Sequence, residues 1–360
     1  MFAKKNLVAA AALLAVAGAA QAQSSVKLYG YVEAGVGSFE AAHAKGAKAR
    51  TTEVTSGKMM TSFIGLSGSE DLGGGLKAEF ALESFLGVDT GAAGGTAYGN
   101  KAGGFWSRGS FVALTGNFGK VALGQYDNPL FTSGYTYNPF GSSMAFSPTM
   151  RHFYYNQANV SQSKATTAFD TGFVNSVTYE TPNFAGFTAT AQYSPKESTA
   201  SGSGNSYALS GTYTAGPLSA SLTYVKSGIA TAYDEDEKVL GLGASYDFGV
   251  VKAFGQYTQI KQTSAAAAAT APAVNAPNKD KIYQLGVSVP VTDKASVMAS
   301  FGKLSNKVTA TGTKETDTVF AIGYDYALSK RTGVYGVFTN NQHTDLVSGQ
   351  TYAVGIKHNF

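Results

Sequence analysis

Apolar and polar residues alternate with a period of two through most of this chain, and this pattern restricts its fold more than any other feature. In residues 76–83 the even positions are Leu, Ala, Phe and Leu, and the odd positions are Lys, Glu, Ala and Glu. In residues 187–193 the odd positions are Phe, Ala, Ala and Tyr, with Thr, Thr and Gln between them. Successive side chains of a β-strand point to opposite faces. The pattern therefore predicts strands with one apolar and one polar face.

The polar face has an unusual composition. It consists mostly of Ser, Thr, Gln and Gly, whereas the wet face of a soluble sandwich usually carries many Lys and Glu residues. Only 14% of all residues are charged, against about 25% in a typical soluble domain. The apolar face ends repeatedly in Tyr or Phe, and such aromatic girdles are typical of barrels that face lipid. After residue 22 no run of 18 apolar residues occurs, so the sequence predicts no membrane-spanning helix in the mature chain.

The amino-terminal segment has the features of a secretory signal. Two lysines precede an apolar run over residues 7–20, which is too short to span a bilayer. Residues 20–22 read Ala-Gln-Ala, the small-x-small pattern of a cleavage site. We therefore expect a signal peptide over residues 1–22 and an exported barrel domain over residues 23–360.

Turn residues divide the mature chain into sixteen expected strands. They cover residues 25–37, 58–68, 76–87, 104–115, 120–127, 172–181, 187–194, 205–214, 218–226, 238–247, 251–261, 281–289, 295–303, 316–326, 332–339 and 351–360. Closing the set requires the first strand to pair with the last, which leaves no backbone group unpaired in hydrocarbon.

The connections between these strands alternate in length. Short ones, rich in Gly, Pro, Asp and Asn, cover residues 69–75, 116–119, 182–186, 215–217, 247–250, 290–294 and 327–331. Long ones fall around residues 38–57, 88–103, 128–171, 195–204, 227–237, 262–280, 304–315 and 340–350. Short periplasmic turns and long extracellular loops are typical of outer-membrane barrels. The expected fold class is all-β: a 16-stranded antiparallel transmembrane β-barrel, wide enough to hold an aqueous channel.

Several sequence blocks resemble the general trimeric porins of β-proteobacteria, a Gram-negative porin family. They are VKLYG at 26–30, GSEDLGGGL at 68–76, NSV at 175–177, PNFAGF at 182–187, LSKRTG at 328–333 and VGIKHNF at 354–360. These blocks follow one another in order, so the resemblance covers the whole mature chain. It implies a passive diffusion channel for small hydrophilic solutes and ions across the outer membrane.

The resemblance also implies partners. Porins of this kind are homotrimers in contact with outer-membrane lipid and lipopolysaccharide. The barrel-assembly machinery reads the aromatic residue at the end of their last strand, and Phe360 matches that position. Packing within the aromatic girdle is the alternative role for Phe360.

The longest connection, residues 128–171, corresponds to a loop that folds into the barrel in the resembling porins. It narrows their pore and places acidic groups opposite arginines on the wall. Low-dielectric walls focus the transverse field between such charges. The resemblance therefore implies a constriction formed by an inward-folded third loop.

This sequence departs from the family at that constriction. Phe63, Gln125 and approximately Gly172 stand where arginine is expected from the resemblance. Arg108 matches a family arginine, although a structural or headgroup contact is an alternative role. With three cations missing, we expect weak anion preference. The candidates for the pore constriction are Arg108, Asp127, Tyr137, Phe140, Phe63, Gln125, Lys77 and Glu79.

The expected third loop is rich in aromatic residues. They are Phe131, Tyr135, Tyr137, Phe140, Phe146, Phe153, Tyr154 and Tyr155. Aromatic faces can stack on sugar rings or apolar solutes, which would give a substrate-preferring pore with an aromatic slide. They can also pack the loop against the inner wall, and both roles remain open.

An outer-membrane barrel hydrolase is the alternative from another functional class. It needs a base oriented near a nucleophile. The chain has four histidines, and His152 has no acidic partner evident from its neighbours in sequence. The chain has no Cys, no HExxH motif and no phosphate-binding loop. A receptor with a plug would need a large domain before the first strand. The net charge of +4 is spread out, which indicates no nucleic-acid partner. We therefore expect no catalysis, cofactor or metal.

Overall fold

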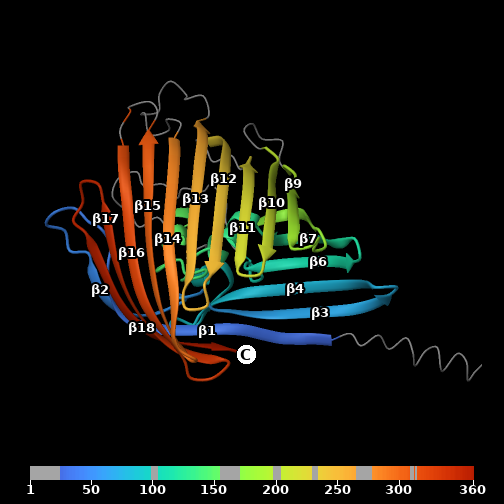
Figure 1. Cartoon of the computed structure of the whole chain (residues 1–360), viewed down its shortest axis with the longest axis horizontal. Helices are drawn as coiled ribbons and strands as arrows, with labels where there is room; N and C mark the ends of the chain where they lie inside the picture. Colours follow the sequence, from blue (N-terminus) through green and yellow to red (C-terminus); the bar gives the residue numbers. More distant parts are fainter. Residues whose placement is uncertain are drawn as a thin grey trace, which may run out of the picture.

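The computed structural model describes residues 25–98, 104–154, 171–197, 204–228, 234–264, 278–308, 312 and 314–360. These residues form an antiparallel β-sheet that curves round on itself (Figure 1). The strands are β1 (Ser25–Glu40), β2 (Arg50–Ser56), β3 (Phe63–Gly73), β4 (Leu76–Gly87), β5 (Ala92–Ala93), β6 (Gly109–Gly116), β7 (Gly119–Asp127), β8 (Gly172–Glu180), β9 (Phe187–Ser194), β10 (Ser206–Ala215), β11 (Leu218–Ser227), β12 (Asp234–Asp247), β13 (Lys252–Ser264), β14 (Asn278–Thr292), β15 (Ala295–Val308), β16 (Lys314–Ala327), β17 (Thr332–His343) and β18 (Gly349–Asn359). The 3-10 helix η1 (Gly94–Tyr98) and the α-helices α2 (Pro129–Thr136) and α3 (Pro148–Tyr154) lie in the connections.

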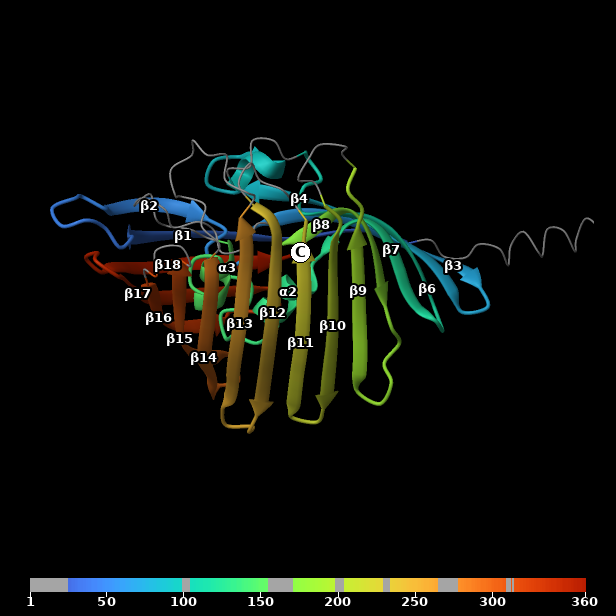
Figure 2. The ribbon, with the colours of Figure 1, turned by 90° about the horizontal axis from the view of Figure 1, so that it is seen from above.

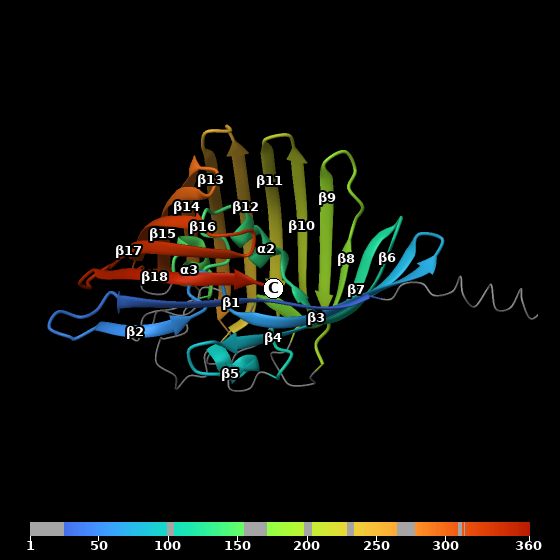
Figure 3. The same cartoon turned by 90° about the horizontal axis from the view of Figure 1, so that it is seen from below.

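Strand β1 closes the sheet into a ring. Its residues 31–38 pair with β18, residues 25–31 pair with β3, and residues 34–40 pair with β2. Figure 3 shows β2 and β3 end to end along one edge of β1, with β18 along the other. β2 and β3 thus count as a single strand position of the barrel. Among the described residues the short strand β5 pairs with the end of β4 and adds no position of its own. Within the described residues the strands fill sixteen places, which confirms the expected 16-stranded barrel.

Most expected strands lie within a few residues of the observed ones. Those at 76–87 and 187–194 coincide with β4 and β9. The strand expected at 104–115 begins only at Gly109, as β6. Several later strands extend further than expected: the strand placed at 295–303 continues to Val308 in β15. Polar residues beyond the apolar part of such strands still take part in the antiparallel ladder.

The strand expected at 58–68 was misplaced. β3 starts at Phe63, and the preceding connection contains the additional strand β2. The backbone leaves the ladder between them because Gly57 has a φ of 69°, in the left-handed region that glycine tolerates. The amide of Lys58 then donates to the side-chain carboxylate of Glu33 at 2.8 Å instead of to a backbone carbonyl of a neighbouring strand.

The apolar faces of the strands point outward. Leu285 is 70% exposed, whereas its neighbour Gln284, on the inner face, is 1% exposed. The same contrast separates Phe187, which is exposed, from buried Gln192 in β9. This is the reverse of a soluble protein and suits a barrel whose outer face meets hydrocarbon. No helix among the described residues has the length and apolarity needed to cross a membrane.

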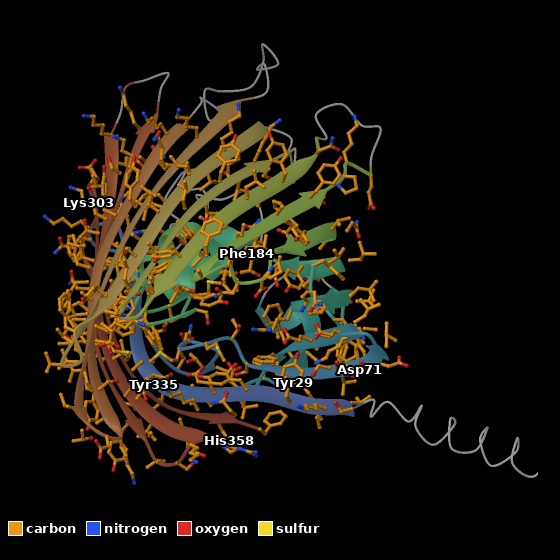
Figure 4. The ribbon with its side chains drawn as sticks, turned by 45° about the vertical axis from the view of Figure 1, so that its right-hand side comes forward. Tyr29, Asp71, Phe184, Lys303, Tyr335 and His358 are labelled. Atoms are coloured by element: carbon orange, nitrogen blue, oxygen red, sulfur yellow. The ribbon has the colours of Figure 1, made fainter. Side chains whose placement is uncertain are left out.

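The turn between β3 and β4 requires backbone conformations that only glycine adopts readily. Gly73, Gly74 and Gly75 have φ values of 83°, 61° and 82°. The amide of Gly73 donates to the Asp71 carboxylate at 2.9 Å. Figure 4 labels Asp71 at the end of this hairpin. The glycine-rich turn expected from the sequence is therefore confirmed.

The carboxy-terminal residue completes the seam between β1 and β18. The amide of Gly30 donates to the carbonyl of Phe360 at 3.2 Å, and the amide of Phe360 donates back at 3.1 Å. The Phe360 ring occupies the space beside Gly30, where an added Cβ would lie 2.5 Å from the ring. Phe360 therefore packs into the closed ring, in agreement with its girdle role. Its recognition during assembly stays a prediction.

Deleting Phe360 should lower the amount of folded, heat-modifiable barrel in the outer membrane without reducing export to the periplasm. Two seam hydrogen bonds and the ring contact are lost. The comparison variant is Gly30→Ala, whose added methyl group would meet both the Phe360 ring and the Phe63 carbonyl, and which retains the terminal aromatic residue. Folded protein is measured on unheated gels after fractionation. A normal yield of the deletion variant would refute a role for Phe360 in assembly, and equal losses in both variants would assign the effect to packing alone.

Candidate functional site

The connection after β7 turns into the barrel. Asn128 caps α2, because its side chain accepts a hydrogen bond from the amide of Leu130 at 2.9 Å, and Pro129 occupies the first helical turn. α2 packs against β10, β11 and β12, and α3 packs against β14, β15 and β16. Figure 2 shows both helices within the curve of the wall. The described part of the expected third loop, up to residue 154, thus lies inside the barrel and is partly helical.

The inner wall has small residues where this loop approaches. A Cβ at Gly243 would collide with the ring of Tyr137, and one at Gly302 would collide with Pro148. The hydroxyl of Tyr137 also lies 3.0 Å from the Ser219 hydroxyl of β11. Close approach of the loop to the wall therefore requires glycine at these two positions.

Most aromatic residues of the loop are buried against the wall or against one another. Those under 9% exposed are Phe131, Tyr137, Phe140, Phe146 and Phe153. Phe153 joins a cluster with wall residues of β10 to β14, and Phe140 and Phe146 join a second with residues of β15 to β18. These contacts favour packing over an aromatic slide for these five rings. Tyr155 lies outside the described residues.

A buried carboxylate connects the tip of the loop to the seam of the barrel. Glu33 in β1 is 2% exposed, and it accepts hydrogen bonds from the Lys58 amide and from the hydroxyl of Tyr335 in β17. The hydroxyl of Ser143 in the loop donates to the carbonyl of Lys58 at 2.6 Å. The ring of Phe146 packs edge-on against Tyr335, with centroids 6.1 Å apart. We call Glu33, Lys58, Ser143 and Tyr335 the loop latch; Figure 4 labels Tyr335.

Arg108 lies just before β6 and is held against the wall strands β3 and β4. Its guanidinium forms an ion pair with Glu83, and it lies 3.9 Å from the centroid of the Phe63 ring. The hydroxyl of Tyr29 donates to the other oxygen of Glu83 at 2.6 Å. The side chain of Gln125 donates to the carbonyl of Ser107 at 2.7 Å, which fixes the segment before Arg108. Phe63 and Gln125, which stand where arginines were expected, therefore help to position Arg108 and carry no positive charge themselves.

A cavity of about 280 Å³ separates this wall from the loop. Arg108, Lys58 and Asp127, at the end of β7, line its wall side, and Phe131 and Tyr154 line its loop side. Arg108 and Asp127 thus line the same cavity, and their role at a constriction stays a prediction. Lys58 was not predicted, because the sequence places it in a regular strand.

The remaining candidates lie elsewhere. Tyr137 and Phe140 are buried between the loop and the wall. The carboxylate of Glu79 accepts a hydrogen bond from Thr115 and forms an ion pair with Lys120 at 3.3 Å. Lys77 is exposed near the short turn before β4. These four do not line the cavity beside Arg108.

His152 has an acidic partner that its neighbours in sequence do not reveal. It lies buried in α3, and its Nε2 is 3.3 Å from the carboxylate of Asp317 in β16. The acidic partner is distant in sequence and could not be recognised from neighbouring residues. Within the described residues Nδ1 of His152 has no hydrogen-bond partner, so no nucleophile completes the pair. No group of three metal-binding side chains occurs in that part of the chain either.

Comparison with known proteins gives consistent similarities. A family model described as "Gram-negative porin" matches residues 9–346. Outer membrane porin protein 32 of Delftia acidovorans is 36% identical over 98% of this chain and 95% of its own length. An outer membrane porin protein of Bordetella pertussis is 30% identical over 99% of this chain and 100% of its own length. The solved anion-selective porin from Comamonas acidovorans superposes with a TM-score of 0.76 at 30% identity, covering 94% of this chain and all of that one.

Replacing Tyr335 by Phe should weaken the loop latch. The buried Glu33 carboxylate loses a donor, and we expect the free energy of unfolding to fall by about 1–3 kcal/mol. The temperature at which the compact band disappears on gels measures this loss. Tyr352→Phe is the control, because its exposed hydroxyl donates to the side chain of Gln350 at 3.0 Å and not to a buried carboxylate. Equal transition temperatures for the two variants would show that the latch does not stabilise the barrel.

Proposed function

The chain belongs to the Gram-negative porin family and forms a passive channel across the outer membrane, and on this premise we propose that its third loop, residues 128–171, narrows the water-filled pore for small hydrophilic solutes and ions. The observation that carries this proposal is the position of α2 and α3 against the inner faces of β10–β16. The loop latch also supports this proposal, because it holds the tip of the loop, at Ser143, against the barrel. The relatives point to a channel rather than an enzyme.

The charges beside the loop nearly cancel. Lys58 and Arg108 are the cations that line the cavity, and Asp127 is the carboxylate in the same lining. Glu83 neutralises Arg108 at close range. A single charge in a wet lumen changes the free energy of a passing ion by about 1 kcal/mol or less, and salt screens it. We therefore propose weak anion preference.

The porin from Comamonas acidovorans is described as anion-selective. In this chain Phe63, Gln125 and Gly172 occupy places where the family resemblance leads us to expect arginine. Phe63 contributes a ring beneath Arg108 instead of a charge. We propose that selectivity for anions is correspondingly weaker here than in a pore lined by several arginines.

We further propose that the channel assembles as a homotrimer in contact with outer-membrane lipid and lipopolysaccharide. The exposed outer rows, such as those containing Leu222 and Leu285, provide the apolar surface for lipid. The mass of the detergent-solubilised channel tests the number of chains, and a mass of one chain would contradict this assembly.

Residues 1–22 are proposed to act as a signal peptide, and the barrel-assembly machinery to recognise the strand that ends in Phe360. The alternation of the terminal strand, with Val354 and Ile356 exposed, supports the latter. Sequencing of the mature amino terminus tests the former; a start at Gln23 is expected, and an uncleaved Met1 would contradict it.

Deleting most of residues 131–168 should raise single-channel conductance by roughly two-fold or more, because the narrowest section dominates the resistance of a pore. Planar-bilayer recording measures this change. The control deletes residues 265–277, in the connection between β13 and β14. Unchanged conductance after the first deletion, or an equal rise after both, would contradict a constriction by the third loop.

Replacing Arg108 by Ala should shift the reversal potential in a salt gradient toward cation preference, because Glu83 then loses its counter-charge. Glu83→Gln should shift it in the opposite direction. Both shifts should shrink at high salt. Arg331→Ala, in the short turn before β17, is the control and should leave the potential unchanged. Strong anion preference that survives Arg108→Ala would mean that other residues determine selectivity.

A further inference from the structure

A second cavity, of about 400 Å³, lies between α2 and the wall formed by β8 to β11. Thr181, Thr214 and Ser219 line it, and these residues adjoin the short turns of the barrel. The cavity therefore lies on the periplasmic side of the third loop. Of its seventeen lining residues, eleven are Ser or Thr and two are Tyr. No Lys or Arg belongs to this described lining.

Register explains why so many hydroxyls gather there. Thr212 in β10 pairs with Thr188 in β9 on one side and with Ser221 in β11 on the other. Ser210 likewise pairs with Thr190. Because successive side chains alternate, the apolar residues between them face outward. Three neighbouring strands thus present a continuous wall of hydroxyls to the lumen.

Some of these hydroxyls hold α2 in place, and others are unused. Ser133 of α2 lies 3.0 Å from Ser221, which joins the helix to the wall. Thr188, Thr190 and Thr212 are half-buried and make no side-chain hydrogen bond within the described part of the chain. A hydroxyl both donates and accepts. These three can therefore bond to a solute without breaking an existing contact.

The cavity adjoins the path of a solute through the proposed constriction. Asp127 lines both this cavity and the one beside Arg108. Glu180 also lines it and accepts a hydrogen bond from Tyr126 at 3.0 Å. Asp127 interacts electrostatically with Arg108, and the backbone of Glu180 pairs with that of Lys120 in the neighbouring strand. The two carboxylates add hydrogen-bond acceptors to a lining that consists mainly of hydroxyls.

We propose that this cavity is a binding subsite for neutral polyhydroxylated solutes, namely sugars of one or two rings, after they pass the third loop. The inference rests on the proposed function, because the cavity exists only with α2 inside the barrel. A sugar presents many hydroxyls that each donate and accept, and this lining offers the same groups in return. The volume lies within the range of small-molecule sites.

The test is block of the ion current by maltose in planar bilayers. Maltose should reduce the wild-type current saturably. The double variant Thr190→Val/Thr212→Val removes two hydroxyls at nearly constant volume. Each lost hydrogen bond should raise the half-blocking concentration several-fold, so we expect roughly a ten-fold rise. Thr188→Val alone provides a milder variant should the double one fail to fold.

Thr339→Val is the matched control. Thr339 faces inward from β17 on another part of the wall and does not line this cavity. It should leave the maltose block unchanged. The same half-blocking concentration in the wild type and the Thr190/Thr212 variant would overturn the subsite.

Two further outcomes separate this inference from the channel itself. Normal conductance without saturable block by maltose overturns the subsite and leaves the channel intact, whereas an absent conductance contradicts the proposed function. Glucosamine that blocks far more strongly than glucose, with a dependence on Glu180 but not on the threonines, would identify a cation site instead and overturn the proposal for neutral sugars.

Discussion

The pairing of every backbone amide within a closed ring is the constraint on which the rest of this structure depends. Hydrocarbon offers no partner to an unpaired N–H or C=O group, so a sheet in lipid cannot have free edges. β1 satisfies this condition by pairing with β18 on one side and with β2 and β3 on the other. Closure then dictates the alternation, because one face of every strand must meet lipid and the other must meet the lumen.

The inner face does more than enclose water. It is adapted to the third loop, with glycines at Gly243 and Gly302 where rings approach and with apolar residues such as Val225 where Leu130 packs. At the wall strands β3 and β4 the charges are supported by neighbours: Arg108 is flanked by Glu83 and Phe63. The wall and the loop therefore determine together which groups a solute encounters.

Local patterns were sufficient to predict most of the fold. Period-two alternation and glycine-rich turns depend on neighbouring residues, so most of the sixteen strands could be placed from the sequence alone. The site was less accessible, because its contacts join distant segments. The role of Phe63 follows from Arg108, which lies 45 positions later in the chain, and the partner of His152 lies in β16. Lys58 was missed because a single left-handed Gly57 removes it from the ladder.

The hydrogen bond between Glu33 and Tyr335 has a consequence for the order of folding. Its partners are 302 positions apart in the chain, and β17 is the last strand but one. Contacts between residues so distant in sequence form late, since the entropy of closing the intervening chain must be overcome first. The loop tip can therefore reach its complete set of partners only when the barrel is almost finished. An incomplete barrel would hold a loosely attached loop, so arrival of the final strands both seals the wall and fixes the tip of the loop.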